Sequence, residues 1–112
     1  MPVSIYHNPR CSKSRQTLQL LRDNGVEPII IEYLTTPPTI AELTEILEKL
    51  NKEPRDIIRR KEAAEEGVDL TLDGKDLIAA LCRHPRALER PIVINGNKAA
   101  MGRPPESVLA II

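Results

Sequence analysis

One cysteine, Cys11, stands in a basic stretch that could support nucleophilic chemistry. Residues 1–22 contain no Asp or Glu. The basic residues around the cysteine are Arg10, Lys13, Arg15 and Arg22. The thiolate is the nucleophilic form of cysteine, and nearby positive charge favours it. A lone cysteine is often only a small buried hydrophobic residue. The polar and charged sequence neighbours of Cys11 make burial of its side chain less favourable. We therefore expect a thiolate that attacks an anionic substrate.

The elements before and after Cys11 would place it at the start of a helix. The apolar run 3–6 predicts a strand, and Asn8-Pro9 predicts a turn. From about Ser12 the residues favour helix, with Leu18 and Leu21 on one face. Unpaired backbone N–H groups converge at a helix N-terminus, where the helix dipole also favours negative charge. These amides should lower the pKa of the thiol and could hold an oxyanion.

A second strand completes a βαβ unit around this helix. The helix is expected to end near Asn24-Gly25, because Gly readily supplies a left-handed cap. Residues 28–33 are β-branched and nearly continuously apolar, which is typical of a strand in a covered parallel sheet. Cys11 would then lie at the C-terminal edge of the first strand, where open α/β sheets usually bind ligands.

The middle of the chain predicts helices only. Thr39 and Glu42 have capping-box spacing before an amphipathic helix that runs to about Asn51. Pro54 suits the first turn of a shorter helix. Residues 61–73 are harder to place, and one interpretation is that the charged run 61–66 forms a helix ended by Gly67. Residues 74–84 form another amphipathic pattern, whose apolar face carries Cys82, so we interpret Cys82 as a core residue.

The last segment predicts a hairpin and a final helix. Asn95-Gly96 between two strand-like runs is a strong hairpin signal, and Pro104-Pro105 opens the helix. The elements together predict an α/β fold: a thioredoxin-like four-stranded mixed sheet (βαβ…ββα) with a helical insertion at about 38–88. The length of 112 residues predicts one domain, 1–112. By analogy with that fold, Pro91 before the third strand is expected to follow a cis peptide bond.

The composition indicates the cellular compartment of the protein and the partners that it could bind. Sixteen basic residues balance sixteen acidic ones, so the net charge favours neither nucleic acid nor an anionic membrane as a partner. There is no apolar run of roughly 18 residues and no secretory signal pattern, so we expect a cytoplasmic protein. We also expect a monomer. The position of a second thiol in a C-x-x-C motif is Ser14. A redox reaction would therefore need a thiol from elsewhere.

Four motifs together resemble the glutaredoxin-coupled arsenate reductase family, and its short members most of all. They are Tyr6-His7-Asn8-Pro9-Arg10-Cys11-Ser12-Lys13-Ser14-Arg15, Ile57-Ile58-Arg59-Arg60-Lys61, Arg90-Pro91-Ile92-Val93 and Gly102-Arg103-Pro104-Pro105-Glu106. They extend over essentially the whole chain, in the order and with the spacing found in the family. Spacing alone does not distinguish Arg59 from its neighbours Arg55 and Arg60.

The resemblance implies a role for each matched residue. Cys11 matches the nucleophile that forms a cysteine–arsenic adduct with arsenate. The three arginines that match the oxyanion ligands are Arg59, Arg90 and Arg103. His7 and Ser14 match positions that support the reactive cysteine. The family uses glutathione as a co-substrate and glutaredoxin as a partner to release arsenite, and the resemblance implies no bound cofactor.

Two other functions are weaker alternatives. Relatives of this fold bind RNA polymerase and sense oxidation through two close cysteines, so a non-catalytic interaction protein is the runner-up, although Ser14 argues against the redox switch. A phosphatase loop needs an arginine six positions after the cysteine, and this position is Thr17. We predict no metal site, because His7, Cys11, Cys82 and His84 contain no pair with ligand-motif spacing.

Overall fold

The chain folds into two units that are described separately. The structure is a computed structural model that describes residues 2–112. The first unit comprises the chain up to Thr36 together with Arg90–Ile112, and the second comprises Pro37–Glu89. The second unit nearly coincides with the helical insertion predicted at about 38–88. That the two units make a single domain stays a prediction from chain length.

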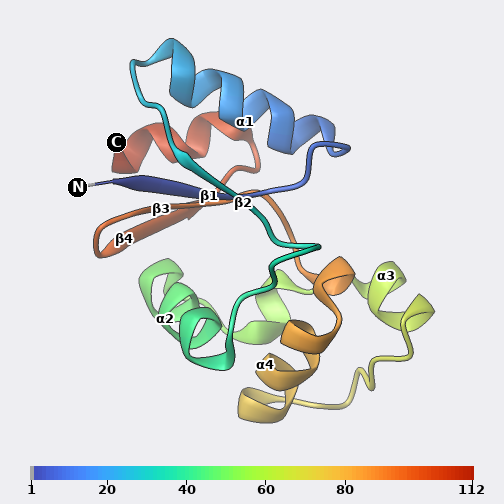
Figure 1. Ribbon diagram of the computed structural model, residues 1–112. Coiled ribbons are helices and arrows are strands. Elements are labelled where there is room, and N and C mark those ends of the chain that lie inside the picture. Colours follow the sequence, from blue (N-terminus) through green and yellow to red (C-terminus); the bar gives the residue numbers. More distant parts are fainter. Residues whose placement is uncertain (1) are drawn as a thin grey trace. The chain divides into compact units, whose positions relative to one another are not determined.

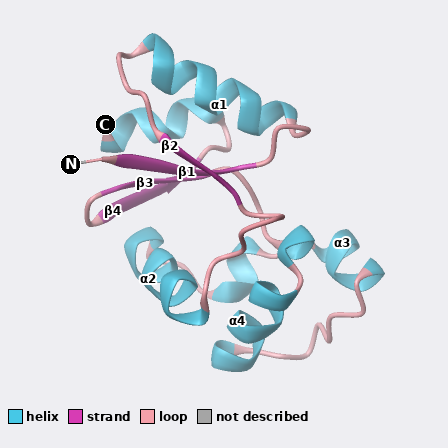
Figure 2. Ribbon diagram, in the orientation of Figure 1, coloured by secondary structure: helices cyan, strands magenta, loops and turns pink. Residues whose placement is uncertain are grey.

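The first unit contains the four-stranded mixed sheet that the sequence predicts. Its strands are β1 (Val3–His7), β2 (Ile29–Glu32), β3 (Ile92–Asn95) and β4 (Lys98–Met101), in the order β2-β1-β3-β4 (Figures 1 and 2). β1 pairs in parallel with β2 and antiparallel with β3, and β3 pairs antiparallel with β4. This order and these directions confirm the thioredoxin-like arrangement.

Two helices lie against one face of this sheet. They are α1 (Ser12–Asp23) and η3 (Pro105–Ile111) (Figure 1). α1 ends as predicted, because Gly25 takes a left-handed conformation with φ of 79° just beyond it. The expected final helix is present as a 3₁₀-helix, and a bond from Ser107 N–H to Pro104 O at 3.0 Å opens it.

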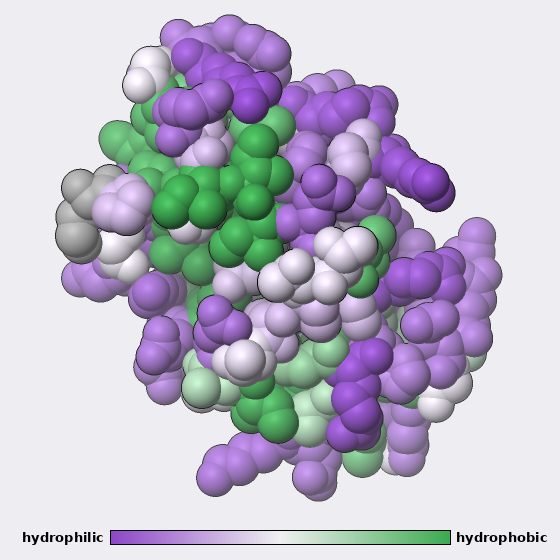
Figure 3. Space-filling view, in the orientation of Figure 1, coloured by the Kyte–Doolittle hydropathy of each residue, from purple (hydrophilic) through white to green (hydrophobic). Residues whose placement is uncertain are grey.

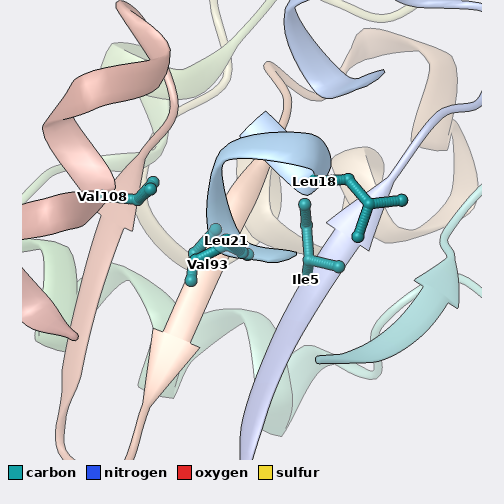
Figure 4. Close-up of a cluster of buried hydrophobic side chains, with 5 residues drawn as sticks. All are labelled: Ile5, Leu18, Leu21, Val93 and Val108. Carbon is teal, nitrogen blue, oxygen red and sulfur yellow. The ribbon is translucent and has the colours of Figure 1, made fainter. Parts of the chain in front are cut away.

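The core of the first unit lies between the sheet and these helices. Figure 4 shows side chains from β1, α1, β3 and η3 gathered there, namely Ile5, Leu18, Leu21, Val93 and Val108. Leu18 and Leu21 are three residues apart, so they share the inward face of α1. Full burial of one such side chain contributes about 1.5–3 kcal/mol. This packing fixes α1, and with it the turn that carries Cys11, on the end of β1.

The expectation of a covered second strand is wrong. Ile29 and Ile30 of β2 are 54% and 41% exposed. Hydrophobic surface is visible in Figure 3 over the part of the first unit that contains β2. The reason is topological, because β2 is an edge strand with a neighbour on one side only. An apolar run alone does not distinguish an edge strand from a central one.

The second unit contains the predicted helices and two further 3₁₀ turns. Its elements are α2 (Ile40–Leu50), η1 (Pro54–Ile57), α3 (Arg60–Glu65), α4 (Gly74–Arg83) and η2 (Pro85–Ala87). The capping box before α2 is present in full, with Glu42 N–H donating to Thr39 Oγ1 and Thr39 N–H donating to Glu42 Oε1. The helix ended by Gly67, one interpretation of the sequence, is also present and is α3.

Cys82 differs in part from its interpretation as a core residue. It lies on α4, one turn after the buried Ile78, but is itself only half-buried. Burial raises the pKa of the Cys82 thiol, as does the negative charge of Glu42, against a smaller opposite effect of Arg83. The thiolate form of Cys82 is therefore disfavoured.

Within residues 2–112 we find no helix with the length and apolar character that crossing a membrane requires.

Candidate active site

Cys11 is the residue that immediately precedes α1. Its backbone is extended, with φ of −91° and ψ of 123°, while its carbonyl already accepts the N–H of Arg15 at 3.0 Å. The turn before it is closed by Cys11 N–H, which donates to Asn8 O at 3.0 Å. Asn8 Oδ1 accepts the N–H of Arg10 at 3.0 Å, which holds the same turn. The strand, turn and helix thus place the thiol at the N-terminus of α1, as predicted.

The sulfur is more enclosed than its polar sequence neighbours suggested. Cys11 is only 9% exposed, but charged groups lie beside it. Nη2 of Arg103 lies 3.5 Å from Sγ, and Nε of Arg103 donates to the backbone oxygen of Arg90 at 2.7 Å. The backbone of one predicted arginine therefore helps to hold the other against the sulfur.

The pKa of the Cys11 thiol is lowered below its ordinary value. Burial alone raises it, but the backbone N–H groups of Ser14 and Lys13 and the charge and hydrogen bond of Arg90 together outweigh burial. The side chain of Cys11 makes no capping hydrogen bond to α1. The amides therefore act by favouring the charged form of a sulfur that lies near them.

The charge that favours the thiolate does not come from the basic residues expected at the start. Arg15 donates to the backbone oxygen of Pro9 at 3.0 Å. Arg22 lies at the opposite end of α1 and pairs with Glu27 at 2.9 Å. Eleven residues of helical rise separate Arg22 from Cys11 by roughly 16 Å. The arginines that act on the thiol come instead from the other end of the sequence: Arg90 lowers its pKa, and Arg103 lies 3.5 Å from Sγ.

His7 and Ser14 form a buried pair beside the cysteine turn. Nδ1 of His7 and Oγ of Ser14 are 2.6 Å apart, and Ser14 Oγ also accepts the N–H of Asn8 at 3.0 Å. Burial is the main reason that the pKa of His7 is lowered; Glu32 opposes this, while Arg22 and Arg15 add to it. A neutral imidazole therefore anchors the hydroxyl that holds the Asn8 end of the turn.

The segments with Arg90 and Arg103 meet at a close backbone contact. The Arg90–Pro91 peptide bond is cis, as predicted, and the Arg103–Pro104 bond is cis as well, which was not foreseen. Gly102 N–H donates to Pro91 O at 2.9 Å. A Cβ atom on Gly102 would lie 2.5 Å from Thr17 Oγ1 and 2.7 Å from Pro91 Cγ. Only glycine fits there, and no local pattern in the sequence predicts this requirement.

The remaining predicted arginine, Arg59, belongs to the second unit. It immediately precedes α3, and its guanidinium is paired with two carboxylates. Nη1 lies 2.9 Å from Glu89 Oε1, and Nε and Nη2 each lie 3.1 Å from Glu62 Oε2. Neither glutamate was a predicted site residue. Glu62 could have been found from its i, i+3 spacing, whereas Glu89 is thirty residues away.

Other features of the structure do not compete with this site. The second unit has a cavity of about 530 Å³, lined by residues of α2, η1 and the start of α4. None of the predicted site residues lines this cavity. Among the described residues, no group of three or more His, Cys, Asp or Glu side chains is arranged to hold a metal ion.

Comparisons with known proteins identify the family of this chain. The model of the ArsC family matches residues 6–111. The arsenate reductase of Haemophilus influenzae is 46% identical, with 100% of both chains covered. The uncharacterized protein YfgD of Escherichia coli is 47% identical over 98% of this chain and 96% of its own length. A solved arsenate reductase from Vibrio cholerae superposes with a TM-score of 0.92 at 45% identity, covering 100% of this chain and 98% of that one. This chain belongs to the ArsC family.

Proposed function

We propose that this protein is an arsenate reductase in which the Cys11 thiolate is the nucleophile. The observation that carries the proposal is the position of Cys11 Sγ, at the N-terminus of α1 and 3.5 Å from Arg103 Nη2. The lowered pKa of this thiol supports the same role. Arsenate is assigned as the substrate from the relatives named above as arsenate reductases.

The first step is attack of the thiolate on arsenate. An As–S bond forms and an As–O bond breaks, and the released oxygen leaves as water after protonation. The substrate brings its negative oxygens toward a negative sulfur, so the site must supply positive charge. Arg90 and Arg103 provide it within the first unit, and a planar guanidinium can donate two bonds to two oxygens. Arg59 is the third proposed oxyanion ligand.

The second step is reduction of the adduct. As(V) becomes As(III), which takes two electrons, and Ser14 stands where a second thiol of a C-x-x-C motif would be. We assign the electrons to two external thiols, one of glutathione as co-substrate and one of glutaredoxin. They leave joined as a mixed disulfide, and cleavage of the As–S bond by water then releases arsenite and restores the Cys11 thiol. No bound cofactor is needed, and such thiols are kept reduced in the cytoplasm.

His7, Ser14 and Pro91 support the nucleophile in this mechanism. The His7–Ser14 pair and the hydrogen bond from Asn8 to Ser14 fix the entry to the cysteine turn. Pro91 precedes β3 and packs near Gly102, so it sets the path of the segment that carries Arg90. These residues hold the thiol and the arginines in register without contacting the arsenic.

The runner-up function, a non-catalytic interaction protein, receives no support from the site. The redox regulators of this fold use two close cysteines, whereas position 14 is a buried serine whose hydroxyl is bound to His7 and Asn8. A cysteine at position 14 would weaken those hydrogen bonds, because a thiol is a poorer donor and acceptor than a hydroxyl.

The direct test is production of arsenite by the purified protein with arsenate, glutathione and glutaredoxin. Cys11→Ser should abolish it, and Cys82→Ser should not. Omission of glutaredoxin should stop turnover if the proposed source of electrons is right. Absence of arsenite from the wild-type protein in the full system would reject the proposed function.

A further inference from the structure

The surroundings of Arg59 are unusual for an arginine that is meant to bind an anion. Its guanidinium already pairs with two carboxylates, Glu62 and Glu89, at 2.9–3.1 Å. The side chains of all three residues are 20–27% exposed, so the group is shielded from solvent more than most surface pairs. One positive charge is therefore held by two negative ones. These two carboxylates could compete with an anion for Arg59.

The backbone around Arg59 explains how the two glutamates reach it. Arg59 N–H donates to Ala87 O, and Glu89 N–H donates to Ile57 O, both at 2.7 Å, on either side of the antiparallel bridge Ile58–Leu88. Arg59 and Glu89 are diagonal neighbours across this bridge, which is within reach for long side chains. The placement of Glu89 beside Arg59 is thus fixed by main-chain hydrogen bonds.

Glu62 comes to Arg59 by a different route. Arg59 is the residue before α3, and its carbonyl accepts the N–H of Ala63 at 2.8 Å. Glu62 lies in the first turn of α3, three residues later, so its side chain points back toward the start of the helix. The two carboxylates therefore reach the guanidinium from separate elements, each with its own support.

The contacts leave part of the guanidinium available. Arginine has five N–H groups in a rigid fork. Glu62 engages Nε–H and Nη2, and Glu89 engages Nη1. Among residues 2–112, these pairs leave one N–H on Nη1 and one on Nη2 for a further acceptor. A guanidinium held at two points loses less freedom when it binds a third group.

We propose that Glu62 and Glu89 are positioning residues, which hold the Arg59 guanidinium by ion pairs so that two of its N–H groups remain available to the substrate oxyanion. This inference rests on the proposed function of Arg59 as an oxyanion ligand. The alternative is that the glutamates compete with the anion for Arg59. The two roles predict opposite changes in arsenate affinity when a glutamate is removed. Removal of a positioning group weakens anion binding, whereas removal of a competitor strengthens it.

The experiment is titration of arsenate by calorimetry into the Cys11→Ser protein, which can bind the anion but cannot react. On this background, Glu62→Ala and Glu89→Ala should each raise the dissociation constant by about threefold to tenfold, the loss expected for a shielded ion pair. Glu62→Gln and Glu89→Gln keep an acceptor oxygen for the guanidinium and should restore most of the affinity. If the two glutamates only stabilised the fold, the glutamine variants would not restore the affinity for arsenate.

Two controls separate this role from others. In the Arg59→Ala background the glutamate variants should have no further effect on the dissociation constant. Glu65→Ala is the matched control, because Glu65 also lies on α3 and pairs with an arginine, Arg86, at 3.2 Å. Affinity should not change in this variant. Thermal unfolding checks that each protein is folded.

The inference is overturned if the alanine and glutamine variants both bind arsenate more tightly, if neither changes affinity, or if the Cys11→Ser parent does not bind arsenate. If only the proposed function fails, arsenate still binds through Arg59, but the wild-type protein releases no arsenite. Binding and turnover thus test the two proposals separately.

Discussion

Nη2 of Arg103 lies 3.5 Å from Sγ of Cys11, although 92 residues separate them along the chain. The contact joins the turn after β1 to the segment after β4, and the backbone oxygen of Arg90 holds the same guanidinium from the other side. Arg90 and Arg103, from two separate segments of the sequence, therefore converge on the sulfur of Cys11. This convergence in the first unit is the basis of the predictions below.

The first prediction concerns the source of the reactive thiolate. Replacing Arg90 with Gln should raise the pKa of Cys11, because the charge and hydrogen bond that offset burial are lost. Turnover of arsenate should fall by roughly tenfold to a hundredfold, as for a lost hydrogen bond to a charged group. Arg22→Gln is the control, since Arg22 pairs with Glu27. Equal effects of the two variants on the pKa of Cys11 would show that Arg90 has no special role.

The second prediction concerns pH and the buried His7. Its pKa is lowered in the folded protein, so between that value and the unfolded value of about 6.5 the unfolded chain binds more protons. His7 therefore contributes stability that is present above about pH 6.5 and is lost as the pH falls toward the folded pKa.

Urea unfolding between pH 5 and pH 7.5 measures this dependence. The free energy of unfolding should fall less steeply on acidification in His7→Gln than in the wild-type protein. His84→Gln removes the other histidine of the chain and is the matched control. An unchanged slope in His7→Gln would mean that burial of this imidazole has no energetic consequence.

The third prediction concerns the close packing at Gly102. Gly102→Ala places a Cβ atom 2.5 Å from Thr17 Oγ1 and 2.7 Å from Pro91 Cγ, so it should destabilise the protein by about 1–3 kcal/mol. Thr17→Ala should relieve part of the clash, which makes the double mutant more stable than the sum of the single changes predicts. Additive effects in urea unfolding would argue that the two residues do not touch.

The fourth prediction concerns the core that holds α1 on the sheet. Leu21→Ala should reduce the free energy of unfolding by about 2–5 kcal/mol, because Leu21 is fully buried with Ile5 and Val93 (Figure 4). Ile29→Ala on the exposed edge strand should cost about 0.5 kcal/mol or less. If both substitutions cost the same, the division into a buried helix face and an exposed strand would be wrong.

Local patterns predicted the elements well, because their causes lie within a few residues. Thr39 and Glu42 predicted the start of α2, and Asn95-Gly96 predicted the hairpin of β3 and β4. The exposure of Ile29 was not predictable, since it depends on which strand lies at the edge. The same holds for the carboxylates of Arg59, because Glu89 reaches it only after the chain has folded back at Ile58–Leu88.

The two cysteines provide the most direct test of the central claim, that Cys11 is a reactive thiolate. The pKa of Cys11 is lowered and that of Cys82 is raised, so each is the internal control for the other. Alkylation of the native protein, followed by mass spectrometry across a range of pH, measures both in one sample. We predict that Cys11 reacts with a midpoint below the free-thiol value of about 8.5, and Cys82 with one above it. Equal midpoints, or the reverse order, would contradict the account.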